Sequence, residues 1–339
     1  MFDVICLGEL LVDFVSEDSG ALLEHAVRFR RAPGGAPANV ACGVVKLGGA
    51  AAFVGKVGDD PFGVFLRYTL DQVGVDTSHL LTTTVARTTL VFVAVHRDGR
   101  KDMCFYRHPG ADMLLRPEEL DEAWLADARA LHFGSISLMA PEPRAATIKA
   151  AQIARRRGAL VTFDPNYRAK LWKSEAEARR VIVEGLPLAD VVKLADDEFE
   201  LVTGTDDFAA GARDILAAGP RLVVVTRGAG GCTFFAAGCK PPDKIDHPVW
   251  GTGWGEVPGF GVEAIETTGA GDAFMASLIV DLLAERSRGR ELVDLDEATL
   301  QRICTRANAA GALTCTRLGA IPGLPTREEV DKFLTQMRE

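Results

Sequence analysis

Long apolar runs and a surplus of basic residues are both missing from this sequence. No stretch approaches the roughly 18 consecutive apolar residues that a membrane-spanning helix needs. The 38 Lys and Arg residues are outnumbered by 47 Asp and Glu residues, giving a formal net charge of −9. A net acidic chain has no general attraction for nucleic acid or an anionic membrane, so we expect neither as a partner. The net charge does not exclude a phosphate ligand, because the N-terminus of a helix binds an anion locally even in a protein that is acidic overall.

Cysteine pairs and a secretory leader are also missing. The seven Cys residues are scattered and show no Cys-x-x-Cys spacing. This favours reduced, buried thiols over a disulfide framework or a zinc site. The opening residues MFDVICLGELLVDF carry carboxylates and no basic n-region, so we expect a strand there and no signal peptide. These features predict a cytoplasmic protein.

Two familiar nucleotide-binding motifs are absent. The chain contains no Gly-x-x-x-x-Gly-Lys-Ser/Thr segment, which excludes a P-loop. It also lacks the Gly-x-Gly-x-x-Gly turn with its following acidic residue that a dinucleotide-binding fold needs.

Strands alternating with helices dominate what is present. Short apolar runs predict strands at 2–8, 51–57, 130–134, 159–163, 190–194 and 221–226. Helices are predicted at 37–47, 62–73, 143–157, 174–185, 207–217, 271–286, 296–316 and 326–337. This rhythm predicts an α/β fold, doubly wound, with a mostly parallel sheet covered by helices on both faces.

Some segments interrupt that rhythm. Residues 88–107 hold two β-rich runs joined by Asp98-Gly99, a hairpin signal, and 27–32 also alternates. We interpret these as a small accessory sheet. Residues 240–260 are rich in Pro, Gly and Trp and predict a long loop or an irregular hairpin. A surface insertion is favoured over a flap near a ligand or an oligomer contact, because loops tolerate insertion.

The segment Thr267-Thr268-Gly269-Ala270-Gly271-Asp272 carries the strongest chemical signal. A Gly-rich turn entering a helix directs several N–H groups, and the positive end of the helix dipole, at one point. Such a site stabilises the charge of a transferring phosphoryl group. Asp272 lies in the first helical turn, where it can accept a proton from an attacking hydroxyl. Taken alone, an Asp that merely favours a helix N-terminus explains the motif better.

A second segment suits a hydroxylated ligand. The glycines of Gly34-Gly35-Ala36-Pro37-Ala38-Asn39 let the backbone approach a ligand, and Asn39 offers a donor and an acceptor. Asp13, shortly after the first strand, can accept bonds from two vicinal hydroxyls. Alone, each also fits a simpler interpretation, as a turn, a helix cap or a solvated carboxylate.

Together the two segments resemble the signatures of the ribokinase-like (pfkB-type) carbohydrate kinases. The resemblance covers essentially the whole chain and implies one kinase domain over 1–339. Strands at about 10–33 and 86–110 would form a lid over the sugar, and 240–260 an irregular insertion. It implies Asp272 as catalytic base, with an anion hole from the N–H groups of 269–271. The nucleotide site would comprise Lys193, Thr226, Arg227, Gly228, Gly231, Gly269, Gly271 and Asn308.

The middle of the chain is similar to fructokinases, through FYRHPGADML at 105–114, FDPNYR at 163–168 and AIPGLP at 320–325. By this similarity Arg107 reaches from the lid toward the substrate, and Arg168 lies near the sugar and the transferring phosphate. The substrate set implied is Asp13, Gly34, Gly35, Asn39, Arg107, Arg168 and Asp272. The expected ligands are ATP, Mg²⁺ and a sugar, and the lid strands would pair two subunits into a homodimer.

Three features depart from the family pattern. Glu266 replaces the usual Asp of a monovalent-cation site that also includes Thr268, which puts K⁺ activation in question. Glu198 matches the Glu of the Asn-x-x-Glu element linked to the water shell of Mg²⁺, but Ala195 replaces its Asn. The insertion within 240–260 is also longer than expected.

The predicted reaction transfers the γ-phosphoryl group of Mg-ATP to O6 of D-fructose. A 2-keto-3-deoxygluconate kinase is the nearest alternative, because it shares the Asp-Pro-Asn and Leu-Trp features. An alternative of another class is a catalytically inactive sugar sensor on the same fold. Asp272 and the intact glycine turn argue against it, because a sensor needs no base.

Overall fold

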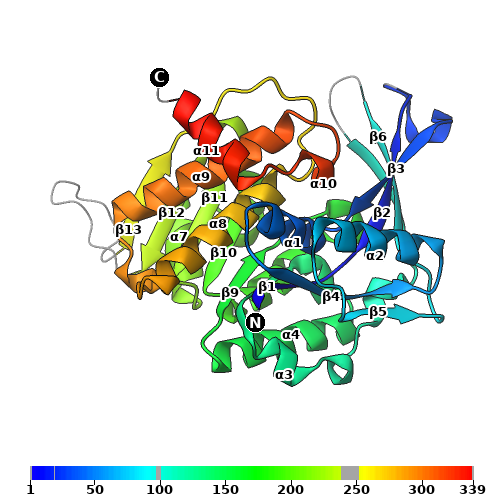
Figure 1. The fold of residues 1–339 in the computed structure, drawn as a ribbon, viewed down its shortest axis with the longest axis horizontal. Helices are drawn as coiled ribbons and strands as arrows, with labels where there is room; N and C mark the ends of the chain where they lie inside the picture. Colours follow the sequence, from blue (N-terminus) through cyan, green and yellow to red (C-terminus); the bar gives the residue numbers. More distant parts are fainter. Residues whose placement is uncertain (1, 19, 97–100, 238–251, 338–339) are drawn as a thin grey trace.

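A large, mostly parallel sheet organises the molecule. The computed structural model describes residues 2–18, 20–96, 101–237 and 252–337 (Figure 1). In this part of the chain a nine-stranded sheet has the order β13-β12-β11-β10-β9-β8-β1-β4-β5. Its strands are β1 (Phe2–Leu7), β4 (Ala51–Gly58), β5 (Leu80–Thr83), β8 (Ala128–Gly134), β9 (Leu160–Asp164), β10 (Val191–Ala195), β11 (Leu222–Thr226), β12 (Cys232–Ala237) and β13 (Thr252–Val257). The neighbours from β5 to β11 pair in parallel, and β12 and β13 close one edge antiparallel.

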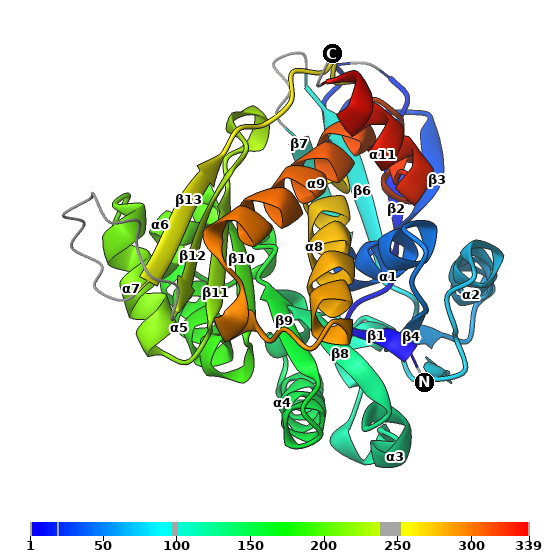
Figure 2. The same ribbon diagram turned by 60° about the vertical axis from the view of Figure 1, so that its left-hand side comes forward.

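Helices cover both faces of this sheet, as Figure 2 shows for the side of α8 and α9. One layer contains α1 (Ala36–Lys46), α2 (Pro61–Val73), α8 (Ala270–Ser287), α9 (Glu297–Cys315) and α11 (Arg327–Gln336). The other contains α3 (Glu122–Leu125), α4 (Pro141–Arg156), α5 (Glu175–Gly185), α6 (Asp196–Thr203) and α7 (Phe208–Ala217). The short α10 (Ala320–Gly323) packs against α1 and α9.

The alternation of side chains along each strand separates two cores. Val4 and Cys6 of β1 pack with the layer of α1 and α8, whereas Ile5 and Leu7 pack with the layer of α4 and α5. Successive strand residues point to opposite faces, and a sheet buried on both faces needs continuous apolar runs. The run FDVICL therefore satisfies both cores at once.

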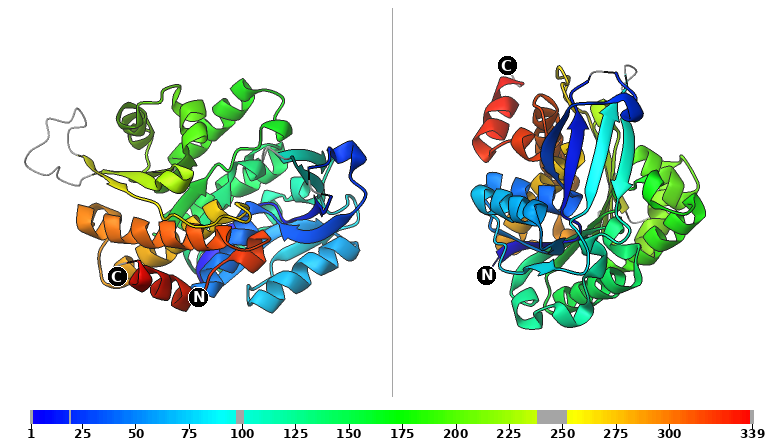
Figure 3. Two further views of the ribbon diagram at one scale, coloured as in Figure 1. Left: turned by 90° about the horizontal axis from the view of Figure 1, so that it is seen from above. Right: turned by 90° about the vertical axis from the view of Figure 1, so that its right-hand side faces the viewer.

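A second sheet stands apart from the first, at the upper right of Figure 1 and facing the viewer in the right panel of Figure 3. It has the order β3-β2-β6-β7, from β2 (Leu11–Ser16), β3 (Phe29–Gly34), β6 (Leu90–Val95) and β7 (Lys101–Tyr106). The central pair β2–β6 is parallel and the outer pairs are antiparallel. This lid sheet confirms the predicted accessory strands; Asp98-Gly99 lies outside the described residues.

The segment 240–260 was predicted as a long loop or an irregular hairpin. Its residues 252–257 form β13, a regular edge strand paired antiparallel with β12. The ring of Phe234 occupies the space next to Gly255, where a Cβ would lie 2.6 Å from the ring. A glycine is therefore required at this position of the strand. Residues 240–251 lie outside the described part, so the rest of the predicted insertion is untested.

Several other short elements were not predicted, namely β5, β12, α3, α6 and α10. β5, α3 and α10 have four residues each, which is too short for a clear periodic signal, whereas β12 and α6 have six and eight residues and were simply missed. No helix in the described ranges is long and apolar enough to cross a membrane.

Candidate active site

One cavity of about 420 Å³ lies between the lid sheet and the carboxyl ends of the central strands. In open α/β sheets, ligands bind at this edge, because the loops after parallel strands meet there. The loops after β1 and β9 contribute Glu9 and Arg168, the first turn of α6 contributes Glu198, and the turn before α8 contributes Thr268. The inner face of the lid closes the cavity with aliphatic side chains such as Leu11 and Val91.

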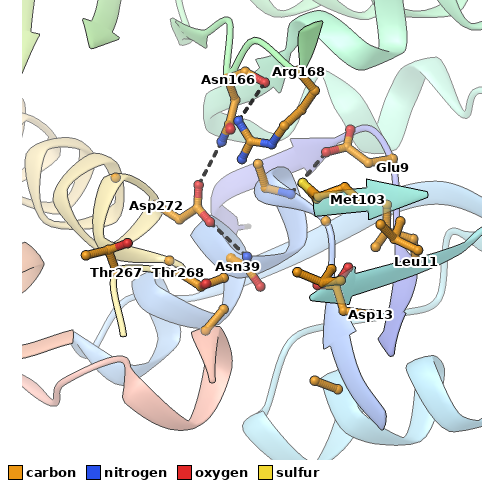
Figure 4. A pocket seen from close by; sticks show the side chains of 18 of the residues that line it. Glu9, Leu11, Asp13, Asn39, Met103, Asn166, Arg168, Thr267, Thr268 and Asp272 are labelled. Carbon is orange, nitrogen blue, oxygen red and sulfur yellow. Dashed lines mark hydrogen bonds between the residues drawn. The ribbon is translucent and has the colours of Figure 1, made fainter. Parts of the chain in front are cut away.

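Asp272 is held in the cavity by two amides (Figure 4). Asn39 Nδ2 donates to one carboxylate oxygen at 2.8 Å, and Asn166 Nδ2 donates to the other at 3.1 Å. Burial raises the pKa of Asp272 to about 6, with Asp164 raising it further and Asn39, Arg168 and Lys193 lowering it. An oriented carboxylate with a pKa close to neutrality suits a general base.

The start of α8 places backbone N–H groups beside this carboxylate. Gly269 adopts φ 85° as the cap, and the helix begins at Ala270. The first N–H groups of a helix have no partner within it, and the helix dipole is positive there. A Cβ at Gly271 would lie 3.1 Å from Lys193 Nζ, so the glycine leaves room for a buried ammonium group. The cavity therefore contains both the N–H groups of a helix start and a buried ammonium group, and each of these can bind an anion.

Lys193 belongs to a buried group of charges. Its Nζ donates to Asp164 Oδ2 at 3.0 Å. Burial alone would lower the pKa of Lys193, but Asp164, Glu198 and Asp272 outweigh it, so the pKa is raised. Burial and Asp164 raise the pKa of Glu198, whose two oxygens accept the N–H groups of Tyr167 (2.5 Å) and Ala195 (2.8 Å). Lys193 stays cationic and faces the start of α8.

The Gly34-Gly35 segment brings backbone against Asp13 and Glu9. A Cβ at Gly34 would lie 2.4 Å from Asp13 Oδ2, and one at Gly35 would lie 2.4 Å from the carbonyl oxygen of Glu9. Gly35 also has φ 113°, which side chains rarely permit. The two glycines thus let α1 start within the cavity, where it presents Asn39.

Two buried acceptors in this cavity have no donor among the described residues. They are Glu9 Oε2 and Asn39 Oδ1. A buried polar atom without a hydrogen bond costs free energy, so native proteins almost always satisfy such atoms. A ligand with hydroxyl groups would supply donors of the kind that these two acceptors lack.

The structure brings most predicted substrate residues together. Those that line the cavity are Asp13, Gly35, Asn39, Arg168 and Asp272. Gly34 lies beneath Asp13 and is not among the lining residues. The Arg168 guanidinium donates to the carbonyl oxygens of Asn166 (3.2 Å) and Tyr167 (3.0 Å), which turns it toward the cavity (Figure 4).

Arg107, predicted to reach the substrate, lies outside the cavity lining. Its guanidinium forms a buried ion pair with Asp112, with Nη2 and Oδ2 2.6 Å apart, and Nε donates to the same oxygen at 2.7 Å. It does not line the cavity described above. A buried guanidinium needs a carboxylate partner, and Asp112, five residues along the chain, supplies it.

The predicted nucleotide residues fall into two groups. Lys193, Gly269 and Gly271 line the cavity, whereas the others lie beside β11. Gly231 approaches the backbone of Val257 and Gly259, where a Cβ would lie 2.1 and 2.4 Å from their atoms. Asn308 of α9 donates to the carbonyl oxygens of Val257 (3.3 Å) and Pro258 (3.1 Å). The loop of Thr226, Arg227, Gly228 and Gly231 therefore meets Asn308 through 257–259, outside the cavity lining.

Glu266 and Thr268, the predicted cation residues, both line the cavity. Glu266 Oε2 accepts the N–H of Gly319 at 2.7 Å, which joins the turn before α8 to the start of α10. Within the described ranges, no three His, Cys, Asp or Glu side chains are grouped closely enough to hold a metal by themselves.

Sequence reasoning gave no role to three residues that the structure places in or beside the site, Glu9, Asp164 and Asn166. Asn166 has φ 48°, a left-handed conformation that Asn tolerates better than most residues. This turns its amide toward Asp272. The Asp-Pro-Asn segment directly after β9 was the available signal, because strand ends in parallel sheets carry ligands.

Comparison with known proteins agrees with this geometry. The model of the pfkB family carbohydrate kinases matches residues 1–327. Probable fructokinase-4 of Arabidopsis thaliana is 42% identical over 332 residues, covering 98% of this chain and 96% of the relative. A crystal structure of fructokinase with bound ATP from Xylella fastidiosa superposes with a TM-score of 0.87 at 32% identity, covering 100% of both chains.

A fructokinase from Vibrio cholerae O395, solved with fructose, ADP and a calcium ion, superposes with a TM-score of 0.81 at 33% identity, covering 98% of each chain. Family match, sequence identity and structural similarity all extend over nearly the full length. The chain therefore belongs to the pfkB family of carbohydrate kinases.

Proposed function

We propose that this protein is a fructokinase that transfers the γ-phosphoryl group of Mg-ATP to O6 of D-fructose. The observation that carries the proposal is the buried Asp272 carboxylate beside the N-terminus of α8, in a cavity with unsatisfied hydrogen-bond acceptors. Relatives named fructokinase, and a related structure solved with fructose and ADP, support the choice of sugar.

In the proposed reaction, some cavity residues bind the sugar and others stabilise the transferring phosphoryl group. Asp13, Gly35, Asn39 and Arg168 orient the sugar so that one hydroxyl faces Asp272. Asp272 accepts the proton of that hydroxyl as its oxygen bonds to the γ-phosphorus, and the bond from phosphorus to the bridging oxygen of ADP breaks. The N–H groups of 269–271, together with Lys193, stabilise the charge on the transferring group.

The nucleotide would extend from this anion hole toward the loop of Thr226–Gly231 and Asn308. Those residues already pack around 257–259, which supports a preformed wall at that end. Mg²⁺ usually reaches proteins through one or two carboxylates, water and the phosphates of its nucleotide. Glu198 fits that role, because it is buried at the cavity and fixed by two backbone N–H groups. When bound, the ion would neutralise phosphate charge.

Three further features belong to this proposal. Glu266 and Thr268 would contribute to a K⁺ site near the anion hole, with the longer Glu replacing the family's Asp. The lid sheet would pair with that of a second subunit, giving a homodimer. The enzyme would act in the cytoplasm, where its substrates are made and its thiols stay reduced.

The decisive experiment measures ADP release with Mg-ATP and a panel of fructose, 2-keto-3-deoxygluconate, ribose, glucose and adenosine. We expect fast turnover on fructose, and a fall of roughly a thousandfold in Asp272→Asn, because a base in a dry site contributes about 10²–10⁴-fold. Asp214→Asn, the same change at an exposed position of α7, is the matched control. Turnover on another sugar alone would reject fructose, and no turnover on any would favour the sensor.

A further inference from the structure

Glu9 is a buried carboxylate in the cavity that the proposed reaction does not use. It follows β1 and is 3% exposed. Its Oε1 accepts the backbone N–H of Ala36, the first residue of α1, at 3.0 Å. The local N-cap, Gly35, has no side chain to do this, so Glu9 caps the helix from a different segment.

The second oxygen of Glu9 has nothing to bind within the described part of the protein. Glu9 Oε2 is fully buried and lacks a hydrogen-bond partner, although the side chain lines the cavity (Figure 4). Arg107, the cation whose charge lowers the pKa of Glu9, forms an ion pair with Asp112, although its Nη2 makes no hydrogen bond of normal geometry. Leaving a buried carboxylate oxygen unsatisfied is costly, so the site is built for a donor that arrives with a ligand.

We propose that Glu9 is a sugar-binding residue, whose Oε2 accepts a hydrogen bond from a hydroxyl of the substrate while Oε1 holds the start of α1. This inference rests on the proposed function for the identity of the sugar. It adds a third carboxylate to Asp13 and Asp272 and couples sugar binding to the position of Asn39. A carboxylate accepts from a hydroxyl more strongly than a neutral oxygen does.

The variant Glu9→Gln separates the two oxygens. Its amide oxygen can still accept from Ala36, while its NH₂ group takes the place of Oε2 and cannot accept from a hydroxyl. A lost bond to a charged group is worth about 1.5–3 kcal/mol, so we expect fructose affinity to fall roughly 10–100-fold. The KM for ATP should change by less than about twofold. Glu24→Gln, at an exposed position of the lid region, is the matched control.

Fructose binding is measured by isothermal titration calorimetry, which requires no turnover, and single-deoxy fructose analogues are measured in the same way. The analogue that lacks the hydroxyl facing Glu9 should bind wild type and Glu9→Gln equally, whereas the others should keep the full difference. An unchanged fructose affinity, or an equal difference for every analogue, would overturn the role of Glu9. Binding without phosphorylation would reject the proposed function and leave this test intact.

A measurement on the wild type covers the case in which Glu9→Gln fails to fold. Burial raises the pKa of Glu9 to about 7, the N–H bonds to its carboxyl group and Arg107 lower it, and Asp112 raises it. A hydroxyl donating to Oε2 favours the ionised form. Fructose binding near pH 7 should therefore release protons both in the wild type and in Asp272→Asn, which removes the other cavity carboxyl group with a pKa near neutrality, detected as a dependence of the binding heat on buffer ionisation. Proton uptake, or no proton exchange, would contradict the proposal.

Discussion

At the residue scale, burial decides how the candidate base behaves. Asp272 is enclosed by two amides and by Lys193 and Asp164, and its pKa is about 6 where an exposed Asp titrates near 4. Only the ionised form can accept a proton, so activity that depends on Asp272 is present above this pKa and is lost as the pH falls through it.

This gives a prediction for the pH profile of kcat/KM for fructose, which reports groups of the free enzyme. The ionised fraction of a group with pKa about 6 falls about tenfold between pH 7 and pH 5. We expect kcat/KM of the wild type to fall at least tenfold over this range, and more steeply if loss of the Glu9 charge also weakens fructose binding. In Glu9→Gln the acidic side of the pH profile should reflect the titration of Asp272 alone. A profile flat to pH 5 would argue against Asp272 as the base.

Arg107 shows what the sequence leaves undecided about a single residue. The sequence places Arg107 after a lid strand, a position from which a side chain could reach the sugar. Its actual environment is set by Asp112 and by Thr89, which donates to the same carboxylate. Nothing in the spacing of these residues reveals whether an arginine faces a cavity or an internal carboxylate, because that depends on how two segments pack.

At the element scale, the turn into α8 is tied to the turn into α10. Gly319 donates to Glu266 Oε2, and Ile265 donates to the carbonyl oxygen of Cys315 at the end of α9. The oxygens of Glu266 and Thr268 are thus carried by a braced segment directly before the anion hole. A cation bound there would act on the helix start rather than on the sugar.

We therefore expect the rate with K⁺ to exceed the rate with tetramethylammonium, at constant ionic strength. Glu266→Gln keeps an oxygen for Gly319 but removes the charge. It should raise the K⁺ concentration needed for half-activation and leave the rate at saturating K⁺ largely unchanged. A rate independent of K⁺ in the wild type would reject the site.

Periodicity in the sequence predicts the ends of the long helices well, whereas a glycine-rich strand escapes it. The long helices α4, α8 and α9 lie within two residues of their predicted ends, because amphipathic or apolar repeats of that length are unambiguous. β13 was missed because Gly253 and Gly255 resemble loop residues. They occur in a strand since Phe234 of β12 fills the space above Gly255.

At the scale of the whole molecule, the lid sheet has two different faces. Aliphatic side chains such as Val91 and Val93 cover the cavity. On the opposite side Phe14 stacks on Phe92, and Tyr106 meets Phe92 edge to face. Its outer strands β3 and β7 each pair with one strand only in the described part of the chain. An open edge and an exposed aromatic residue are common features of surfaces that pair with another chain.

We expect sedimentation velocity to give a particle of about twice the 36.3 kDa chain mass at micromolar concentration. Tyr106, which is 63% exposed, should lie near that contact. Tyr106→Glu should shift the equilibrium toward monomer, whereas Tyr68→Glu on α2, 61% exposed, should not. A monomeric wild type would reject the lid dimer.

The sequence by itself determined the layers of this protein and the segments that carry its chemistry. Apolar runs of fixed length specify strands, and two glycine turns at helix starts specify where an anion and a hydroxylated ligand can approach, because these properties are local. The tertiary structure alone decided which buried groups face the cavity. It turned Arg107 inward to Asp112, aimed Asn166 at Asp272, and left one oxygen of Glu9 without a donor. Those outcomes depend on which distant segments meet, and no local pattern encodes the partner of a buried charge.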